Sequence, residues 1–164
     1  MRNPFDKIFN TLKEAVQWRD EQRKNGRTVA VTNGCFDIMH RGHAQYLYNA
    51  AAEADCLMVL VNSDESIAEL KGPDRPVVEE VNRTYMLASL ECVDAVVVFN
   101  DERATGEFEA IKPDVYVKGA DYTEDTLNRE EYAVLKSGGA VFKFIEFVPG
   151  CSTTNIIKKI KAED

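Results

Sequence analysis

The sequence is poor in histidine, tryptophan and cysteine, and it has no long apolar run. Its 164 residues include 2 histidines, 1 tryptophan and 4 cysteines. The cysteines are scattered, with no Cys-x-x-Cys pair and no secretory leader, which is the pattern of an intracellular protein in a reducing compartment. No apolar run approaches the roughly 20 residues of a membrane span. We therefore expect a cytoplasmic protein that does not cross a membrane.

Positive charge is also scarce. The 28 Asp and Glu residues outnumber the 20 Lys and Arg residues, so the net charge is -8 at pH 7 with histidine neutral. Such a chain is not broadly attracted to nucleic acid or to an anionic membrane, and we expect neither as a partner. A domain of about 150 residues buries roughly 68–70% of the surface of its unfolded chain, so this one needs no disulfide or metal staple. We expect one domain with at most a small appendage.

Short apolar segments alternate with amphipathic segments from residue 28 onwards. Strands are predicted over residues 28–32, 57–61, 95–99, 115–117 and 141–147, and helices over residues 44–54, 79–90, 105–111, 127–136 and 153–161. Continuously apolar strands that alternate with helices are typical of a parallel sheet covered on both faces. We therefore predict an α/β fold, a Rossmann-like doubly wound parallel sheet of about five strands with helices on both faces.

The residues before this pattern are predicted to form a separate element. Residues 5–23 carry apolar side chains at helical spacing, and Asn25-Gly26 ends that run. We expect residues 1–26 to be an N-terminal helix that provides a packing or dimerisation surface, with Trp18 in the core or the interface. Residues 27–164 are expected to form the main domain, and the chain is expected to be a homodimer.

Both histidines lie in one short motif, His40-Arg41-Gly42-His43, between the first predicted strand and the next helix. We expect the first turn of that helix to carry both imidazoles on one face, because residues three apart on a helix are neighbours. A helix start offers free N–H groups and the positive end of the helix dipole, which suit phosphates. Gly42 lets a ligand approach the backbone, so the motif predicts a compact set of donors for phosphate oxygens.

Further polar motifs follow the other predicted strands at the same ends. Lys71 and Arg75 lie in the loop after the second strand, and Lys118-Gly119-Ala120-Asp121 follows the fourth. Ser152-Thr153-Thr154 follows the fifth strand and opens the last helix. Open α/β sheets bind ligands beyond the carboxyl ends of their strands, so we expect these motifs to converge on one site.

Together these motifs resemble a known enzyme superfamily. Gly34-Cys35-Phe36-Asp37 followed by His40-Arg41-Gly42-His43 is similar to the His-x-Gly-His signature of the nucleotidyltransferases, and Ser152-Thr153-Thr154 is similar to the Ser-Thr-Thr helix start of their small members. The sequence resembles more closely the adenylyltransferases that make ADP-heptose from heptose 1-phosphate. The segments that carry this closer resemblance are Thr32–Asp37, Val61–Asp64, Leu70–Gly72 with Arg75–Val77, Val117–Tyr122 and Gly150–Ile157.

The resemblance covers the chain from about Gly26 to the C-terminus and implies a free-standing nucleotidyltransferase domain, because no sugar-kinase domain precedes it. It implies transfer of AMP from ATP to a sugar 1-phosphate, first of all D-glycero-β-D-manno-heptose 1-phosphate, with release of pyrophosphate. The product would be a nucleotide-activated heptose for surface lipopolysaccharide.

The resemblance also assigns roles to residues of this sequence. His40, His43 and Lys71 would be catalytic, and Lys71, Arg75 and Arg83 would hold the substrate phosphate. Nucleotide-binding residues would be Asn33, Gly34, Cys35, Phe36, Asp37, Gly42, His43, Lys118, Gly119, Asp121, Tyr122, Ser152, Thr153 and Thr154. No protein ligand set for a metal is implied. Mg²⁺ is expected to arrive with the ATP phosphates, with Asp37 as a candidate helper.

Two departures from the related patterns bear on the substrate. Glycerol-phosphate cytidylyltransferases carry Arg-Thr-Glu-Gly where this chain has Phe147-Val148-Pro149-Gly150, and the missing arginine favours ATP over CTP. Ala120 stands where the heptose enzymes usually have a second glycine. The alternatives are a cytidylyltransferase acting on glycerol 3-phosphate or another phosphorylated acceptor, and a nucleotide-binding regulatory module without turnover. The intact histidine pair and the basic loop argue against the regulatory module.

Each motif also has a purely structural interpretation. Two histidines alone are an incomplete zinc site, because third and fourth ligands are needed. The structural alternatives are surface histidines at 40 and 43, a solvated loop for Lys71 and Arg75, a plain helix cap at Ser152, an ion pair of Lys118 with Asp121, a surface salt bridge for Arg83 and a turn-forming role for Asp37.

Overall fold

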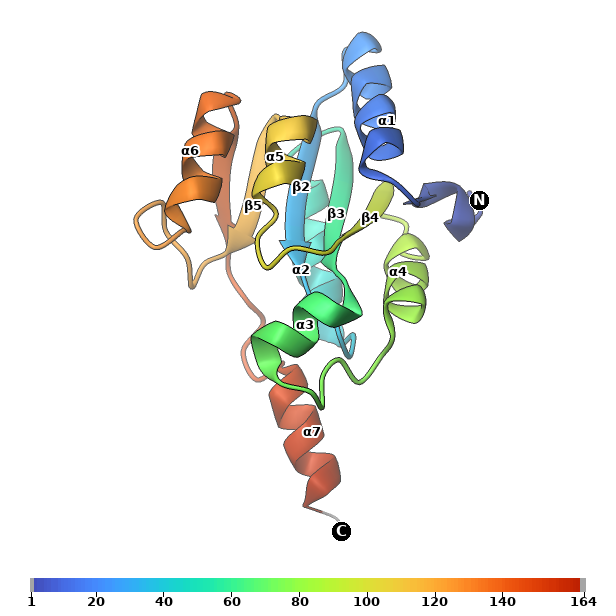
Figure 1. Cartoon of the computed structure of the whole chain (residues 1–164), viewed down its shortest axis with the longest axis vertical. Coiled ribbons are helices and arrows are strands. Elements are labelled where there is room, and N and C mark those ends of the chain that lie inside the picture. Colours follow the sequence, from blue (N-terminus) through green and yellow to red (C-terminus); the bar gives the residue numbers. More distant parts are fainter. Residues whose placement is uncertain (1, 163–164) are drawn as a thin grey trace.

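A computed structural model describes residues 2–162 of the chain (Figure 1). The strands are β1 (Ile8–Phe9), β2 (Val29–Gly34), β3 (Cys56–Asn62), β4 (Ala95–Phe99), β5 (Val115–Gly119) and β6 (Val141–Ile145). The helices are the 3-10 helix η1 (Pro4–Lys7) and the α-helices α1 (Leu12–Lys24), α2 (Arg41–Ala51), α3 (Asp64–Lys71), α4 (Glu80–Ala88), α5 (Thr105–Ile111), α6 (Arg129–Ser137) and α7 (Thr153–Lys161).

The strands form one sheet in the order β1-β4-β3-β2-β5-β6, and every neighbouring pair is parallel. From β2 the chain winds outwards through β3 to β4, and it then crosses back to place β5 on the other side of β2. The prediction of a doubly wound parallel sheet is therefore confirmed. The winding changes direction between β2 and β5, where open α/β sheets form a ligand-binding crevice.

Both faces of the sheet are covered, because successive strand residues point to opposite sides. Val29 and Val31 belong to one buried cluster, which also contains Ala15 of α1 and Phe108 of α5. Ala30 belongs to the other cluster, together with side chains of α2 and α4. In Figure 1, α1, α5 and α6 lie in front of the sheet and α2 lies behind it. Helices α3 and α7 lie beyond the carboxyl ends of the strands, at the lower end of the view.

The N-terminal segment differs from the predicted single helix. Residues 4–7 form η1, and Ile8 and Phe9 pair in parallel with Val96 and Val97 of β4 as a sixth, edge strand. Helix α1 begins only after Thr11, whose hydroxyl accepts from the Glu14 N–H while the Glu14 carboxylate accepts from the Thr11 N–H. This capping box sets the helix start more strongly than the apolar spacing does. The expectation of a helix outside the sheet is wrong for residues 5–11, and a dimerisation role for residues 1–26 stays a prediction.

The helix after β2 also begins earlier than predicted. Helix α2 begins at Arg41, because the Nδ1 atom of His40 accepts a hydrogen bond from the His43 N–H at 3.4 Å and so caps the helix. At the other end of the chain, β6 ends at Ile145 rather than at residue 147. The segment after β6 therefore leaves the sheet before it reaches Ser152, the N-cap of α7.

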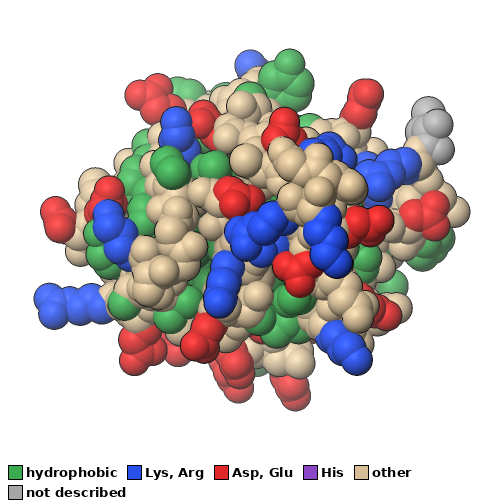
Figure 2. Space-filling view, turned by 90° about the horizontal axis from the view of Figure 1, so that it is seen from above, with side chains coloured by type: hydrophobic (Ala, Val, Ile, Leu, Met, Phe, Trp, Pro, Cys, Tyr) green, Lys and Arg blue, Asp and Glu red, His purple; other side chains and the backbone are tan. Residues whose placement is uncertain are grey.

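The end of the molecule opposite α3 and α7 carries charged side chains of both signs. Figure 2 views this end and shows Lys and Arg side chains interspersed with Asp and Glu, with no histidine in sight. Two of the ion pairs near the starts of the strands join Arg23 to Asp114 and Arg2 to Asp94. Within residues 2–162, no helix is both long enough and apolar enough to cross a membrane.

Candidate active site

A cavity of about 700 Å³ lies at the carboxyl ends of β2 and β5, where the winding of the sheet reverses. Its walls come from the end of β2, the start of α2, the loop after α3, the end of β5 and the segment that leads into α7. The lining residues are Asn33–Phe36, His40, Gly42, His43, Tyr46, Lys71, Arg75, Lys118, Gly119, Asp121, Tyr122 and Phe147–Thr154. The structure thus brings all the candidate site residues to one cavity except Asp37 and Arg83.

The two imidazoles lie in contact with each other. Their ring centroids are 3.9 Å apart and the planes are 15° from parallel, so the rings are stacked. The His43 ring also packs against Phe36 in a T-shaped arrangement, with centroids 5.5 Å apart. Gly42 is required between them, because a Cβ there would lie 2.8 Å from the Cβ of Cys151 and 2.9 Å from Cε1 of His40. This close approach brings the starts of α2 and α7 together at the cavity.

The surroundings of both histidines disfavour the protonated form. Burial, together with the neighbouring His40 and Lys71 and opposed by Asp37, lowers the pKa of His43 to about 4. Burial also lowers the pKa of His40. Within residues 2–162 the Nδ1 atom of His43 is buried without a hydrogen-bond partner. A phosphate that enters the cavity would raise both pKa values, because a nearby negative charge favours the imidazolium form.

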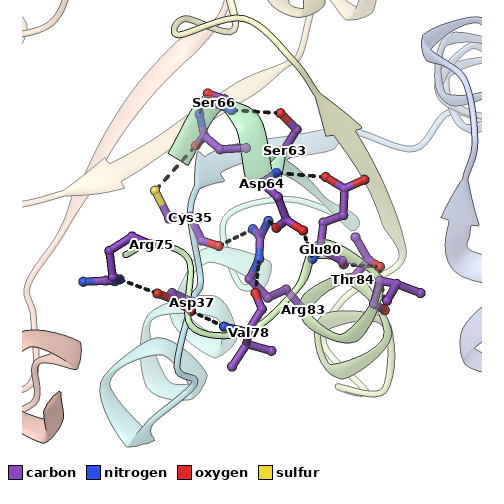
Figure 3. Close-up of polar contacts among 12 residues, drawn as sticks. Cys35, Asp37, Ser63, Asp64, Ser66, Arg75, Val78, Glu80, Arg83 and Thr84 are labelled. Atoms are coloured by element: carbon purple, nitrogen blue, oxygen red, sulfur yellow. Dashed lines mark hydrogen bonds and ion pairs between the residues drawn. The ribbon is translucent and has the colours of Figure 1, made fainter. Parts of the chain in front are cut away.

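The basic loop after α3 is anchored by Asp37. Nε of Arg75 donates to the Asp37 carboxylate at 2.6 Å, and the N–H groups of Val77 and Val78 donate to it at 2.9 and 2.8 Å (Figure 3). Burial alone would raise the pKa of Asp37, but these hydrogen bonds outweigh it and lower the pKa below its ordinary value. Arg75 and Lys71 line the cavity, whereas Asp37 lies behind its wall. The structural interpretation of Asp37 fits this geometry, because Arg75 and two backbone N–H groups engage its carboxylate, and a contact of Asp37 with a nucleotide stays a prediction.

Arg83 does not reach the cavity. Its side chain is fully buried, and its guanidinium donates to the carbonyl of Cys35 at 2.6 Å, to the carbonyl of Val78 at 2.9 Å and to the Asp64 carboxylate at 2.7 Å (Figure 3). The predicted place of Arg83 beside the substrate phosphate does not agree with this geometry, and its ion pair with Asp64 is not a surface salt bridge, because the Arg83 side chain is fully buried. Helix α4 turns this side chain inwards, where it ties the turn after β2 to the start of α3 and to the basic loop.

Lys118 forms the floor of the cavity with Asn33. Its ammonium donates to Oδ1 of Asn33 at 2.7 Å and to the carbonyl of the same residue at 3.3 Å. The Tyr116 hydroxyl donates to Oδ1 of Asn33 at 3.0 Å. Burial lowers the pKa of Lys118, although Glu131 and Asp121 act in the opposite direction. The structural alternative, an ion pair of Lys118 with Asp121, is not formed, and the ammonium bonds to Asn33 instead.

Aromatic side chains that sequence reasoning missed also line the cavity. The ring of Phe147 lies 6.1 Å from that of Tyr46, and a Cβ on Gly119 would overlap the Phe147 ring. Tyr46 follows His43 by one helical turn, which is a signal that the sequence does contain. Phe147 precedes the Ser-Thr-Thr motif, but its entry into the cavity depends on where β6 ends.

The start of α7 completes the site. Oγ of Ser152 accepts from the Asn155 N–H at 3.3 Å, and the Thr153 hydroxyl donates to the carbonyl of Ile38 at 3.3 Å. Thr153 thereby ties α7 to the loop that precedes α2. Two helix N-termini then open on one cavity, and each supplies N–H groups and a positive dipole end. The arrangement suits a polyphosphate.

A known protein family matches this architecture. Residues 31–159 match the family described as "Cytidylyltransferase-like". The chain belongs to this family. Family membership confirms the resemblance to the nucleotidyltransferases and makes the chain a nucleotidyltransferase.

Similar proteins of this family come from several bacteria. The chain is 44% identical over 139 residues to "Bifunctional protein HldE" of Syntrophotalea carbinolica, covering 85% of this chain and 28% of that protein. It is 44% identical over 158 residues to the HldE protein of Helicobacter pylori strain J99, covering 96% and 31%. The Campylobacter fetus HldE protein is 47% identical over 138 residues, covering 84% and 29%. The chain thus spans less than a third of the length of these relatives.

A solved structure has a similar fold. The lipopolysaccharide core biosynthesis protein from Thermoplasma volcanium GSS1 superimposes with a TM-score of 0.59 at 23% sequence identity. The match covers 75% of this chain and 98% of that one. At this identity the likeness concerns the fold alone.

Proposed function

We propose that this nucleotidyltransferase transfers AMP from ATP to a sugar 1-phosphate, giving an ADP-sugar and pyrophosphate. The first candidate acceptor is D-glycero-β-D-manno-heptose 1-phosphate. We place the reaction in the cytoplasm and propose that its product is used to make lipopolysaccharide. The observation that carries the proposal is the meeting of two helix starts at Gly42 and Cys151, beside the stacked histidines and the basic loop. The similarity to HldE proteins supports a sugar phosphate as the acceptor.

The reaction needs positioning and charge stabilisation rather than a nucleophilic side chain. An oxygen of the sugar phosphate attacks the α-phosphorus of ATP, the bond from that phosphorus to the bridging oxygen breaks, and pyrophosphate leaves with the electron pair. Negative charge grows on the bridging and equatorial oxygens. His40 and His43 are proposed to donate to these oxygens, together with the N–H groups at the starts of α2 and α7.

Lys71 and Arg75 are proposed to hold the sugar phosphate or the departing pyrophosphate. Lys71 is the last residue of α3, and the loop that follows it and carries Arg75 is already tethered to the turn after β2 through Asp37. A tethered loop loses less conformational freedom when it binds an anion, which favours affinity. Arg83 supports the same turn through the carbonyl of Cys35 and is proposed to take no part in substrate binding.

Mg²⁺ is proposed to enter as the complex with ATP. Within residues 2–162 no cluster of three or more His, Cys, Asp or Glu side chains could hold a metal ion. The Asp37 carboxylate is already engaged by Arg75 and by two backbone N–H groups. Phosphate oxygens and water supply most ligands of Mg²⁺ in nucleotide enzymes, so this site fits a metal carried by the substrate. In the described part of the chain the two histidines therefore have no third and fourth protein ligand with which to bind zinc.

The nucleotide preference is proposed to be ATP. The segment from Phe147 to Gly150 lines the cavity and has no arginine, unlike the corresponding segment of glycerol-phosphate cytidylyltransferases. The second candidate is transfer of CMP to glycerol 3-phosphate or a similar acceptor, which the family description favours.

Pyrophosphate release separates these candidates. The purified chain is incubated with Mg²⁺ and either ATP or CTP, against a panel of sugar 1-phosphates and glycerol 3-phosphate. Release that depends on both ATP and a sugar 1-phosphate supports the proposal. Release only with CTP would replace it with the second candidate, and release with no pair would refute both.

A further inference from the structure

The side chain of Asn33 is held in a defined orientation at the floor of the cavity. An ammonium group only donates hydrogen bonds, so the atom 2.7 Å from Nζ of Lys118 must be the carboxamide oxygen. The hydroxyl of Tyr116 meets the same oxygen at 3.0 Å. Rotating the carboxamide by half a turn would bring its NH₂ group against the ammonium, two donors face to face. The orientation is therefore set by chemistry and not by an arbitrary assignment.

Asn33 lines the cavity, and in this orientation its oxygen meets Lys118 and Tyr116 while its NH₂ group does not. In the part of the chain that the structure describes, Nδ2 of Asn33 donates to no protein atom, whereas Oδ1 has two donors. Asn33 lies near the carboxyl end of β2 and its partner Lys118 near that of β5, on either side of the reversal of the sheet. Two strands and a buried tyrosine thus hold one amide donor at the ligand crevice.

The amide donor of Asn33 is uncharged. The groups expected to hold the phosphates are the stacked histidines, Lys71 and Arg75, together with the N–H groups at the starts of α2 and α7. An uncharged donor suits an uncharged acceptor, so we place a hydroxyl oxygen of the substrate beside Asn33.

We propose that Asn33 donates from Nδ2 to a sugar hydroxyl oxygen of the bound substrate, and that Tyr116 and Lys118 are positioning residues that hold the carboxamide for this contact. The inference rests on the proposed function for the identity of the substrates. Two sugars share this chemistry, the ribose of ATP and the acceptor sugar. The test therefore measures each substrate separately.

Asn33→Asp is the decisive variant. The carboxylate keeps an oxygen on Lys118 and even gains an ion pair, but it replaces the NH₂ donor by an acceptor. A purely structural role for Asn33 therefore predicts unchanged substrate KM values in a folded protein. Our proposal predicts that KM for one substrate rises about tenfold, because one hydrogen bond is lost.

Tyr116→Phe tests the positioning role without emptying the core. It removes only the hydroxyl that donates to Asn33, so KM for the same substrate should rise about threefold. The matched control is Tyr132→Phe on α6, which removes a hydroxyl that donates to Glu124 at 2.8 Å away from the cavity. The control should keep both KM values of the wild type.

Pyrophosphate release is measured with each substrate varied while the other is saturating, and thermal unfolding is followed for every variant. A rise in one KM that is shared by Asn33→Asp and Tyr116→Phe supports the proposal. A rise in the KM for ATP identifies the ribose, and a rise in the KM for the sugar phosphate identifies the acceptor sugar. Both KM values within twofold of wild type in folded Asn33→Asp would overturn it.

Failure of the proposed function would look different, because the wild type would then release no pyrophosphate. In that case calorimetric titration of a non-hydrolysable ATP analogue and of the sugar 1-phosphate into wild type and Asn33→Asp decides the inference. Weaker binding of either compound to Asn33→Asp supports it. Equal affinities in the two proteins, or binding to neither, overturn it.

Discussion

Replacing Arg83 by methionine separates structural support from substrate binding. Arg83 is fully buried and donates to the carbonyl oxygens of Cys35 and Val78 and to the carboxylate of Asp64. Methionine has a similar length and packs well in apolar surroundings, so it removes these three hydrogen bonds and leaves no large cavity. We expect Arg83→Met to lower the free energy of unfolding while the KM values of the folded enzyme change little.

The magnitude follows from the exposure of each partner. The Asp64 side chain is 37% exposed and stays hydrated without Arg83. Losing its ion pair with Arg83 therefore lowers the free energy of unfolding only slightly. The two carbonyl groups lose hydrogen bonds to a charged donor, and such bonds contribute about 1.5–3 kcal/mol each. Both contacts are only part-buried, so the lower part of this range applies and the sum is about 3–4 kcal/mol. For a domain of this size, about 2–4 °C per kcal/mol gives a melting temperature lower by roughly 10 °C.

Urea unfolding and thermal melting measure the loss of stability in Arg83→Met. Pyrophosphate release with the sugar phosphate varied gives its KM, which would rise if Arg83 bound the substrate phosphate. The matched control is Arg103→Met, because the Arg103 side chain is 51% exposed and forms a surface ion pair with Glu102 at 3.1 Å. This control should change the unfolding free energy by less than about 0.5 kcal/mol. An Arg83→Met protein of wild-type stability with a raised KM for the sugar phosphate would refute the reasoning and restore the phosphate role of Arg83.

Three further predictions concern the cavity. His43→Ala should lower turnover by about 10²–10³, because one donor to the transition-state charge is lost, while the protein remains folded. Wild-type turnover would contradict this role. The pKa of His43 is about 4 in the folded protein against 6.5 ordinarily, so unfolded chains bind the proton first as the pH falls. The free energy of unfolding should therefore fall by about 2 kcal/mol between pH 6.5 and 4, allowing for partial solvent screening. Urea titrations should show a flatter profile in His43→Gln, and equal slopes would contradict the shift. Finally, Lys71→Ala and Arg75→Ala should raise KM for the sugar phosphate about tenfold and change binding of an ATP analogue much less. Lys136→Ala on the surface of α6 is the control, and unchanged acceptor KM values in both loop variants would leave the loop without a catalytic role.

The helices and strands were largely predictable, because the spacing of apolar residues along the chain indicates which faces of each element are buried. The run Leu57–Val61 is apolar at every position because both faces of β3 are covered, and such a run indicates a central strand without knowledge of its neighbours. Ser63 and Ser152 mark helix starts by the same local rule, since each side chain caps an N–H three residues later. The edge strand Ile8–Phe9 was missed because two residues are too few to show a period.

The convergence of the site motifs was predictable as well. In a parallel sheet all carboxyl ends lie at one edge, so motifs that follow different strands must meet there. His40, Lys71, Lys118 and Ser152 lie far apart in the chain and line one cavity for this reason. No knowledge of strand order was needed for that inference.

The partner of each charged side chain was decided only by the tertiary structure. Asp37 and Arg75 are 38 positions apart, and Cys35 and Arg83 are 48 positions apart. A lone arginine on an amphipathic helix has the same sequence signature whether it faces a substrate or two backbone carbonyl groups of neighbouring segments. The packing of α4 against the turn after β2 directs Arg83 inwards. The path of the loop after α3 brings Arg75 into hydrogen-bonding distance of the Asp37 carboxylate. The sequence by itself determined which elements form and at which end of the sheet a ligand binds, because those depend on local periodicity and strand direction. The roles of Arg83, Asp37 and Asn33 depend on distances across the fold, which only the folded chain sets.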